Sequence, residues 1–147
     1  MNASTSTGQS AALGTFVLRV TLGVALIAHA LLKLLVFTLP GTAQFFGSLG
    51  LPPFLGYVVF AAELAGGALL VIGVGSRYVA AAMVPILLGA LWAHSGNGWV
   101  FSGKGGGWEY PAFWTAALVA QVLLGDGAYA LGTKFFGQSA AARLQRA

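Results

Sequence analysis

The ionisable side chains that could do chemistry are few, and most of them lie within apolar segments. The chain has seven Lys and Arg, three Asp and Glu, and two His. His29 and Lys33 are one helical turn apart in one apolar segment, and Glu63 lies in the next. An imidazole, an ammonium and a carboxyl group can exchange protons and hydrogen-bond a polar ligand. Because each is costly to place in lipid, we take His29, Lys33 and Glu63 as the candidate catalytic residues.

A second group of ionisable residues could bind a cofactor. His94 and Glu109 lie near the outer ends of two later apolar segments, and with His29 they form the candidate cofactor-binding set. Two histidines in a helical bundle suggest a haem with two imidazole ligands. At a rise of 1.5 Å per residue, however, their depths differ by roughly 10 Å, which disfavours a shared iron. A haem or chlorin on His29 alone stays open, although no pattern specifies it.

Arg19 and Asp126 are predicted to form a structural ion pair. Counted from the outer ends of their helices, Arg19 lies roughly 27 Å deep and Asp126 roughly 25 Å deep. Both therefore lie near the inner interface. A structural role is favoured over catalysis, since an Arg side chain at that depth can reach the lipid headgroups.

Other kinds of site lack the residues that they require. The chain has no Cys, which excludes disulfides and thiolate metal sites, and no metal site is predicted. The Lys-Gly-Gly-Gly run at 104–107 lacks the spacing of a phosphate-binding loop. No Ser/His/Asp arrangement, two-histidine zinc helix or dinucleotide fingerprint occurs. The basic residues are scattered singly, so nucleic acid is not an expected partner.

Long uncharged stretches indicate which elements carry these residues. The chain is 58% hydrophobic and 7% charged, with a mean hydropathy of +0.85, whereas a soluble domain has about 25% charged residues. Four apolar segments are long enough to cross a membrane, at 13–37, 54–74, 77–95 and 111–131. We therefore predict an all-α, integral-membrane four-helix bundle. A polar N-terminal segment (1–12) precedes this domain (13–131), and a basic C-terminal tail (132–147) follows it.

The loops and the basic residues predict the orientation of the bundle. The longer loops, 38–53 and 95–110, fall on one side, and part of the first is amphipathic enough to lie in the interface. Positive residues favour the cytoplasmic side. Lys33 and Lys104 are on the side of these loops, whereas the opposite side has Arg19, Arg77, Lys134, Arg143 and Arg146. Both termini are therefore predicted to be cytoplasmic, with the basic tail resting on anionic lipid.

Helical periodicity predicts that the polar residues face one another inside the bundle. At 100° per residue, His29 and Lys33 share one face of the first helix. Glu63 shares a face of the second helix with Gly66 and Gly67, small residues that allow close helix packing in lipid. His29 lies roughly 12 Å and Glu63 roughly 14 Å from the outer ends of their helices. We therefore expect these side chains to be neighbours in the outer half of the bundle.

The same residues carry a resemblance to a known family. In chain order they are Leu18-Arg19, Gly23, His29, Lys33-Leu34, Phe46, Leu49-Gly50-Leu51-Pro52, Glu63-Leu64, Gly66-Gly67, Leu69-Leu70, Gly73, Arg77, His94 and Gly106-Gly107-Trp108-Glu109. In this pattern the chain closely resembles the DoxX-like family of four-helix membrane proteins over residues 13–131. After Gly125-Asp126-Gly127 the chain departs from the family, because Tyr129-Ala130-Leu131-Gly132 replaces the common Ser-Leu-Asp ending.

The resemblance implies a multi-pass protein of the bacterial inner membrane, in some relatives a small subunit of a quinone-linked oxidoreductase. Our leading hypothesis is a membrane subunit of a redox or electron-transport assembly, with a quinone or lipid site near the outer leaflet. His29 and Glu63 then hydrogen-bond a quinone carbonyl and exchange protons, while Lys33 stabilises negative charge. A quinone is favoured over a haem or chlorin.

The alternative is a non-catalytic accessory subunit of a larger respiratory or photosynthetic complex. In that case the polar cluster holds the helices together, and the glycine faces pack against neighbouring helices. The expected partners are the lipid bilayer and other membrane subunits. A transporter is disfavoured because the four helices show no internal repeat.

Overall fold

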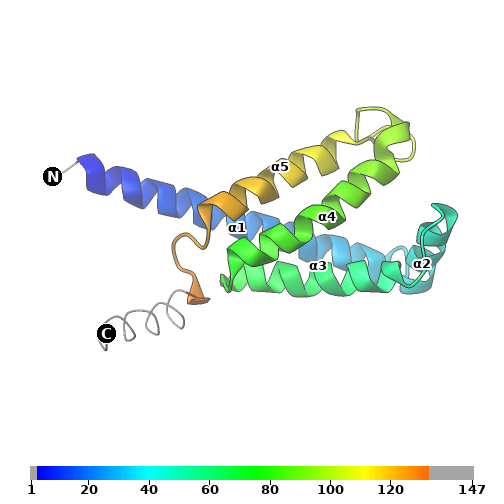
Figure 1. Cartoon of the computed structure of the whole chain (residues 1–147), viewed down its shortest axis with the longest axis horizontal. Helices are drawn as coiled ribbons and strands as arrows, with labels where there is room; N and C mark the ends of the chain where they lie inside the picture. Colours follow the sequence, from blue (N-terminus) through cyan, green and yellow to red (C-terminus); the bar gives the residue numbers. More distant parts are fainter. Residues whose placement is uncertain (1–2, 133–147) are drawn as a thin grey trace.

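Residues 3–132, which the computed structural model describes, form α-helices joined by short loops. The elements are α1 (Ala3–Leu35), α2 (Leu39–Ser48), α3 (Leu55–Ile72), α4 (Ser76–His94), the short 3-10 helix η1 (Ser95–Asn97) and α5 (Glu109–Leu124). No strand occurs in this range. Helices α1, α3, α4 and α5 form the bundle, and α2 lies at one end of it (Figure 1). The prediction of an all-α four-helix bundle is therefore confirmed.

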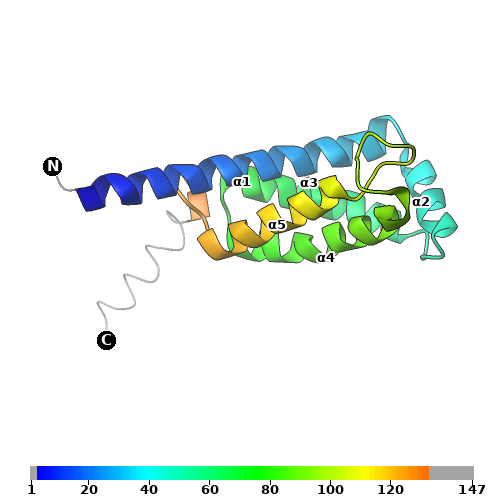
Figure 2. The same cartoon turned by 90° about the horizontal axis from the view of Figure 1, so that it is seen from above.

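The bundle consists of two helix pairs. Helix α1 packs mainly along α3, and α4 packs mainly along α5, with fewer contacts between the pairs. Successive long helices run in opposite directions, as Figures 1 and 2 show. The segment with α2 and the loop between α4 and α5 lie at the same end of the bundle, which confirms that the two longer loops share one side.

Three helices are long and apolar enough to cross a membrane. The spans are Thr7–Leu35, Leu55–Ile72 and Ser76–Asn97, with mean hydropathies of 2.0, 2.0 and 1.5. Large apolar side chains such as Val17 and Leu88 are exposed on their surfaces. Lipid tails solvate such a surface well. The chain is therefore a membrane protein with several spans.

Helix α5 is shorter than the predicted segment 111–131. It ends at Leu124, because Gly125 adopts φ 81° and ψ −143°. The chain then crosses this end of the bundle, where Ala128 N donates to Ala12 O at 3.0 Å and Gly132 N donates to Gly73 O at 2.8 Å. The 16 residues of α5 reach about 24 Å at 1.5 Å per residue. The prediction that this helix continues to residue 131 is wrong, because the glycine breaks it early.

The first two helices also differ from the predicted boundaries. Helix α1 begins at Ala3, so that most of the predicted polar segment 1–12 continues the first helix. Its first turns project past the rest of the bundle (Figure 1). Helix α2 forms within the loop predicted to be amphipathic. Thr38 caps it by accepting a hydrogen bond from Gly41 N at 3.2 Å, and Pro40 occupies its first turn, where a missing N–H costs nothing.

A backbone contact between two glycines sets the distance between α1 and α3. A Cβ atom placed on Gly23 would lie 2.7 Å from the carbonyl oxygen of Gly67, and one placed on Gly67 would lie 2.7 Å from that of Gly23. Neither position has room for a side chain. The predicted glycine face of the second long helix is therefore confirmed as a packing surface.

Replacing Gly67 with Ala is expected to lower the free energy of unfolding by about 1–3 kcal/mol, because the added methyl group forces two backbones apart. The measurement is reversible unfolding of the purified chain in detergent mixtures. Gly89→Ala is the matched control, since a Cβ on Gly89 of α4 meets nothing within 4 Å. Equal losses from the two substitutions would contradict the role of the contact.

Candidate functional site

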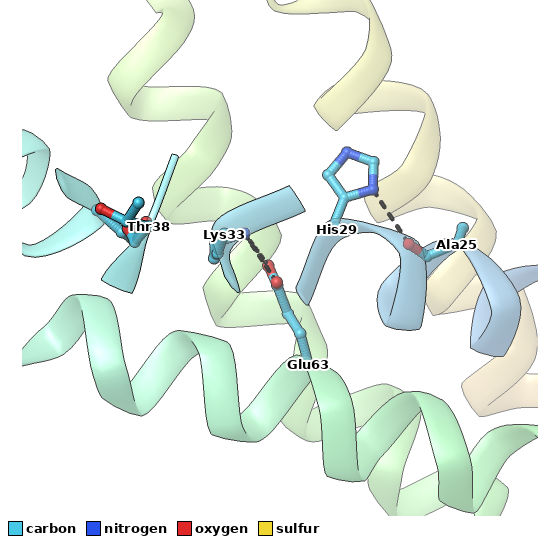
Figure 3. A network of polar contacts seen from close by, with 6 residues as sticks. Ala25, His29, Lys33, Thr38 and Glu63 are labelled. Carbon is cyan, nitrogen blue, oxygen red and sulfur yellow. Dashed lines mark hydrogen bonds and ion pairs between the residues drawn. The ribbon is translucent and has the colours of Figure 1, made fainter. Parts of the chain in front are cut away.

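An ion pair between α1 and α3 forms the centre of the candidate site. Nζ of Lys33 donates to Oε1 and Oε2 of Glu63 at 2.9 and 2.7 Å (Figure 3). The two side chains are only 16% and 7% exposed. It is the one ion pair found within residues 3–132. His29 also lies close enough to Glu63 to interact electrostatically. The structure thus brings the three predicted catalytic candidates together.

The faces of the two helices explain why these side chains meet. Along α3 the buried residues are Gly56, Glu63, Gly66, Gly67 and Leu70. These positions recur at helical spacing and form one stripe. An ionisable group in a span avoids lipid, so both Lys33 and Glu63 turn towards the other helix. The predicted inward orientation of Glu63 is therefore confirmed.

The ring of His29 connects this ion pair to α5. Its Nδ1 is 3.1 Å from the carbonyl oxygen of Ala25. Because a carbonyl oxygen only accepts, Nδ1 carries the proton, and Nε2 of the neutral ring is an acceptor. The ring stacks with Tyr110 at 5.9 Å between centroids and 19° between planes, and meets Trp114 edge-on at 4.7 Å. An imidazole acceptor thus lies beside two aromatic walls.

Sequence reasoning did not identify Tyr110 and Trp114 as part of the site. They are four residues apart at the start of α5 and pack against each other at 5.5 Å between centroids. Trp114 is only 5% exposed, and its Nε1 has no hydrogen-bond partner within the described residues. The spacing of two amphipathic aromatics on one helix face was the available signal.

His94 and Glu109, the other two cofactor-binding candidates, hydrogen-bond to the glycine-rich loop between η1 and α5 (residues 98–108). Nδ1 of His94 lies 3.1 Å from the carbonyl oxygens of both Gly105 and Gly106. Oε1 of Glu109 accepts a hydrogen bond from Phe101 N at 2.9 Å. These side-chain hydrogen bonds hold the connection between α4 and α5. Within residues 3–132, no group of three or more His, Cys, Asp or Glu could hold a metal ion.

A shallow pocket lies next to Tyr110 on the outside of the cluster. Its volume is about 420 Å³, and its walls are mostly apolar. It is lined by Trp99, Phe101, Glu109, Tyr110 and Phe113. Tyr110 is therefore a wall shared by this pocket and the His29 ring.

Arg19 binds backbone carbonyls at the other end of the bundle. Its side chain is fully buried. Nη1 donates to Leu70 O at 2.7 Å and to Val71 O at 3.1 Å, and Nη2 donates to Ala128 O at 3.1 Å. Two of these acceptors belong to the last turn of α3, where a cation is favourable. Arg19 therefore ties α1 to the end of α3 and to the segment after α5.

Asp126 is near Arg19 but is not joined to it by a direct ion pair in the described structure. Its carboxylate interacts with Arg19 electrostatically, while Oδ1 accepts a hydrogen bond from Ser76 N at 2.9 Å. Asp126 thus caps the start of α4. The sequence predicted the common depth of the two residues but not their hydrogen-bond partners. Lys134, Arg143 and Arg146 of the predicted basic tail lie outside the described residues.

Comparison with known proteins supports the resemblance seen in the sequence. The sequence model of the DoxX family matches residues 14–96, which include Lys33 and Glu63. The Bacillus subtilis (strain 168) protein named "Putative oxidoreductase CatD" is 43% identical over 79 residues, which cover 54% of this chain and 58% of that protein. The match thus spans less than two thirds of the relative's length. No solved structure matches. With more than half of its length matched by the family model, the chain belongs to the DoxX family.

Proposed function

We propose that this chain is an integral-membrane subunit of a redox or electron-transport assembly and binds a quinone headgroup beside His29. The observation that carries the proposal is the buried Lys33–Glu63 ion pair one turn from a histidine ring that packs against aromatic side chains. This grouping combines a proton-exchanging imidazole, two opposite charges and flat apolar walls. The oxidoreductase name of the Bacillus relative supports the redox part.

Trp114 indicates that the cluster suits a ligand with hydrogen-bond acceptors. A buried donor without an acceptor costs about 1–3 kcal/mol. The indole Nε1 of Trp114 is such a donor within the described residues. A quinone carbonyl oxygen accepts hydrogen bonds, and the flat quinone ring stacks on aromatic side chains such as Tyr110. The residues present therefore fit a quinone.

Each charged side chain has a separate role in this proposal. The quinone takes up two electrons from a partner subunit and two protons, one through His29 and one from water at the membrane surface. His29 first takes up a proton at Nε2, and the resulting imidazolium donates a hydrogen bond to a ring oxygen and transfers that proton to it. Glu63 exchanges protons with His29, and Lys33 stabilises the negative charge that develops on the oxygen. The aromatic pocket next to Tyr110 gives the flat ring access from the bilayer.

Quinone bound to the purified chain tests the proposal. We expect a lipid extract of gently purified protein to contain close to one quinone per chain, without a Soret band in the absorption spectrum. Trp114→Phe should lower quinone affinity by about tenfold, because one buried hydrogen bond is lost. Trp92→Phe on the exposed face of α4 is the control and should retain the quinone. A Soret band without quinone would favour haem instead.

The accessory-subunit role remains the second candidate, and one observation favours it. Lys33 and Glu63 satisfy each other's charges through two short hydrogen bonds, so the pair requires no ligand to be stable. In that case the ion pair joins α1 to α3 and takes no part in proton transfer. The two candidates predict different turnover for variants in which the charges of Lys33 and Glu63 are removed or exchanged.

The orientation proposed for the bacterial inner membrane gives a direct labelling result. Cysteines introduced at Ser6 and Lys104 should react differently with an impermeant thiol reagent in intact cells, since the chain has no Cys of its own. We expect labelling at position 104 and none at position 6, because basic residues favour the cytoplasmic side. The reverse pattern would show that both proposed sides are exchanged.

A further inference from the structure

We propose that a pocket at the turn between α3 and α4 binds the headgroup of a zwitterionic phospholipid, phosphatidylethanolamine. The pocket lies at the opposite end of the bundle from the glycine-rich loop (Figure 1). It is a shallow, open pocket of about 370 Å³. Its walls come from the start of α4, namely Gly75, Arg77 and Tyr78, and from the end of α5 and beyond, including Leu124, Gly125 and Asp126.

The pocket lies where lipid headgroups are found. The span of α4 begins at Ser76, so Arg77 is at the first turn of a membrane-crossing helix. Asp126 follows the last residues of α5 on the same end of the bundle. The ends of spanning helices lie at the headgroup layer. A phospholipid is therefore the ligand with the highest local concentration at this site.

The pocket contains two side chains of opposite charge, Arg77 and Asp126, which form no ion pair with each other in the described structure. Arg77 is exposed and makes one long hydrogen bond, from Nη2 to Leu123 O at 3.4 Å. Asp126 is held in place because its Oδ1 accepts from Ser76 N at 2.9 Å. Within residues 3–132, no ion pair joins Arg77 to Asp126. A guanidinium pairs well with phosphate, and a carboxylate pairs with an ammonium group. Phosphatidylethanolamine carries both complementary charges.

The remaining walls suit the glycerol and the upper acyl chains. Tyr78 is 80% exposed and Leu124 is 53% exposed, and both present apolar surface beside the charges. Gly75 and Gly125, with positive φ angles of 60° and 81°, have no side chains, so these parts of the wall are backbone. An anionic headgroup without an ammonium would approach the Asp126 carboxylate, whose charge is offset by Arg19 without a direct ion pair in the described part of the chain. The charge pattern therefore favours the zwitterionic lipid.

Lipid titrations of the purified full chain, followed by native mass spectrometry, test this proposal. Short-chain phosphatidylethanolamine and phosphatidylglycerol are titrated separately against delipidated protein. We expect the first lipid to bind about fivefold more tightly, as for one partly exposed ion pair. Arg77→Gln should weaken both lipids about fivefold. Asp126→Asn keeps an acceptor for Ser76 N and should remove only the preference between the lipids.

Lys104→Gln is the control, because it removes the same charge from the exposed loop at the other end of the bundle. It should leave both affinities unchanged. Equal affinity of the unmodified chain for the two lipids would overturn the zwitterionic assignment. Unchanged binding in Arg77→Gln, or an equal loss in Lys104→Gln, would overturn the site itself. None of these outcomes depends on the quinone proposal.

Discussion

A chain with both Lys33→Gln and Glu63→Gln is expected to assemble normally and to support quinone reduction at least about 100-fold more slowly than the unmodified chain. Glu63→Gln preserves the side-chain shape and Lys33→Gln shortens its side chain by one bond. Both charges are removed together, so neither partner is left as an unpaired ion. Proton transfer by a positioned side chain contributes about 10² to 10⁴ in rate, and an amide cannot provide it. The measurement is quinone-reductase turnover of the intact complex, divided by the amount assembled.

A charge-exchanged chain, with Lys33→Glu and Glu63→Lys, completes this experiment. It keeps an ion pair between α1 and α3 but exchanges the positions of the carboxylate and the ammonium relative to His29. We expect it to assemble and to lose at least about tenfold in turnover, because the acid–base groups are misplaced. Wild-type turnover per complex in both double variants would exclude the catalytic role and favour the accessory subunit. Glu63→Gln alone discriminates less well, since it leaves Lys33 unpaired.

Arg19→Met is expected to lower the free energy of unfolding by about 3–5 kcal/mol. The guanidinium donates to three carbonyls from two parts of the chain, and hydrogen bonds to a charged group contribute about 1.5–3 kcal/mol each. The methionine side chain fills only the space of the arginine stem, so the loss combines the three hydrogen bonds with a small cavity where the guanidinium was. Circular dichroism of the purified chain during unfolding in detergent measures the effect.

Two further substitutions separate geometry from charge in this contact. Arg19→Lys keeps the charge but lacks the planar fork that reaches α3 and the segment after α5 together, and should recover less than half of the loss. Arg77→Met removes an exposed arginine at the same end of the bundle and should change stability by no more than about 0.5 kcal/mol. Equal losses from Arg19→Met and Arg77→Met would contradict the importance of the buried hydrogen bonds.

Helical periodicity and depth predict much of the candidate site. The positions of His29 and Lys33 on one face, and of Glu63 on the facing helix, follow from 100° per residue and from the cost of ionisable groups in lipid. The same arithmetic does not select the partner of Glu63. A residue count resolves depth to about one turn, and the flexible lysine side chain can extend over that distance.

The sequence predicts less well the contacts that involve backbone atoms or special glycine conformations. Arg19 binds carbonyl oxygens, and every residue offers such an acceptor, so no residue type indicates which carbonyls are used. The early end of α5 depends on Gly125, whose φ is 81°. Gly125-Asp126-Gly127 is a typical helix-stop signal, but the mostly apolar residues after it favour a longer helix. Tyr110 and Trp114 lie beyond a loop, and their approach to His29 depends on how α5 tilts against α1.

Helix α1 is longer than the hydrocarbon layer is thick, so its length determines how far it projects from the membrane. Its 33 residues extend about 50 Å, whereas the hydrocarbon layer is about 30 Å thick. The first turns, rich in Ser and Thr and free of charged side chains, therefore project into water as a rigid helical extension beyond one membrane surface. A fluorophore attached at Ser10 of this extension would lie at a defined height above the membrane surface. Its energy transfer to a dye in the headgroup layer would therefore report the tilt of the whole bundle.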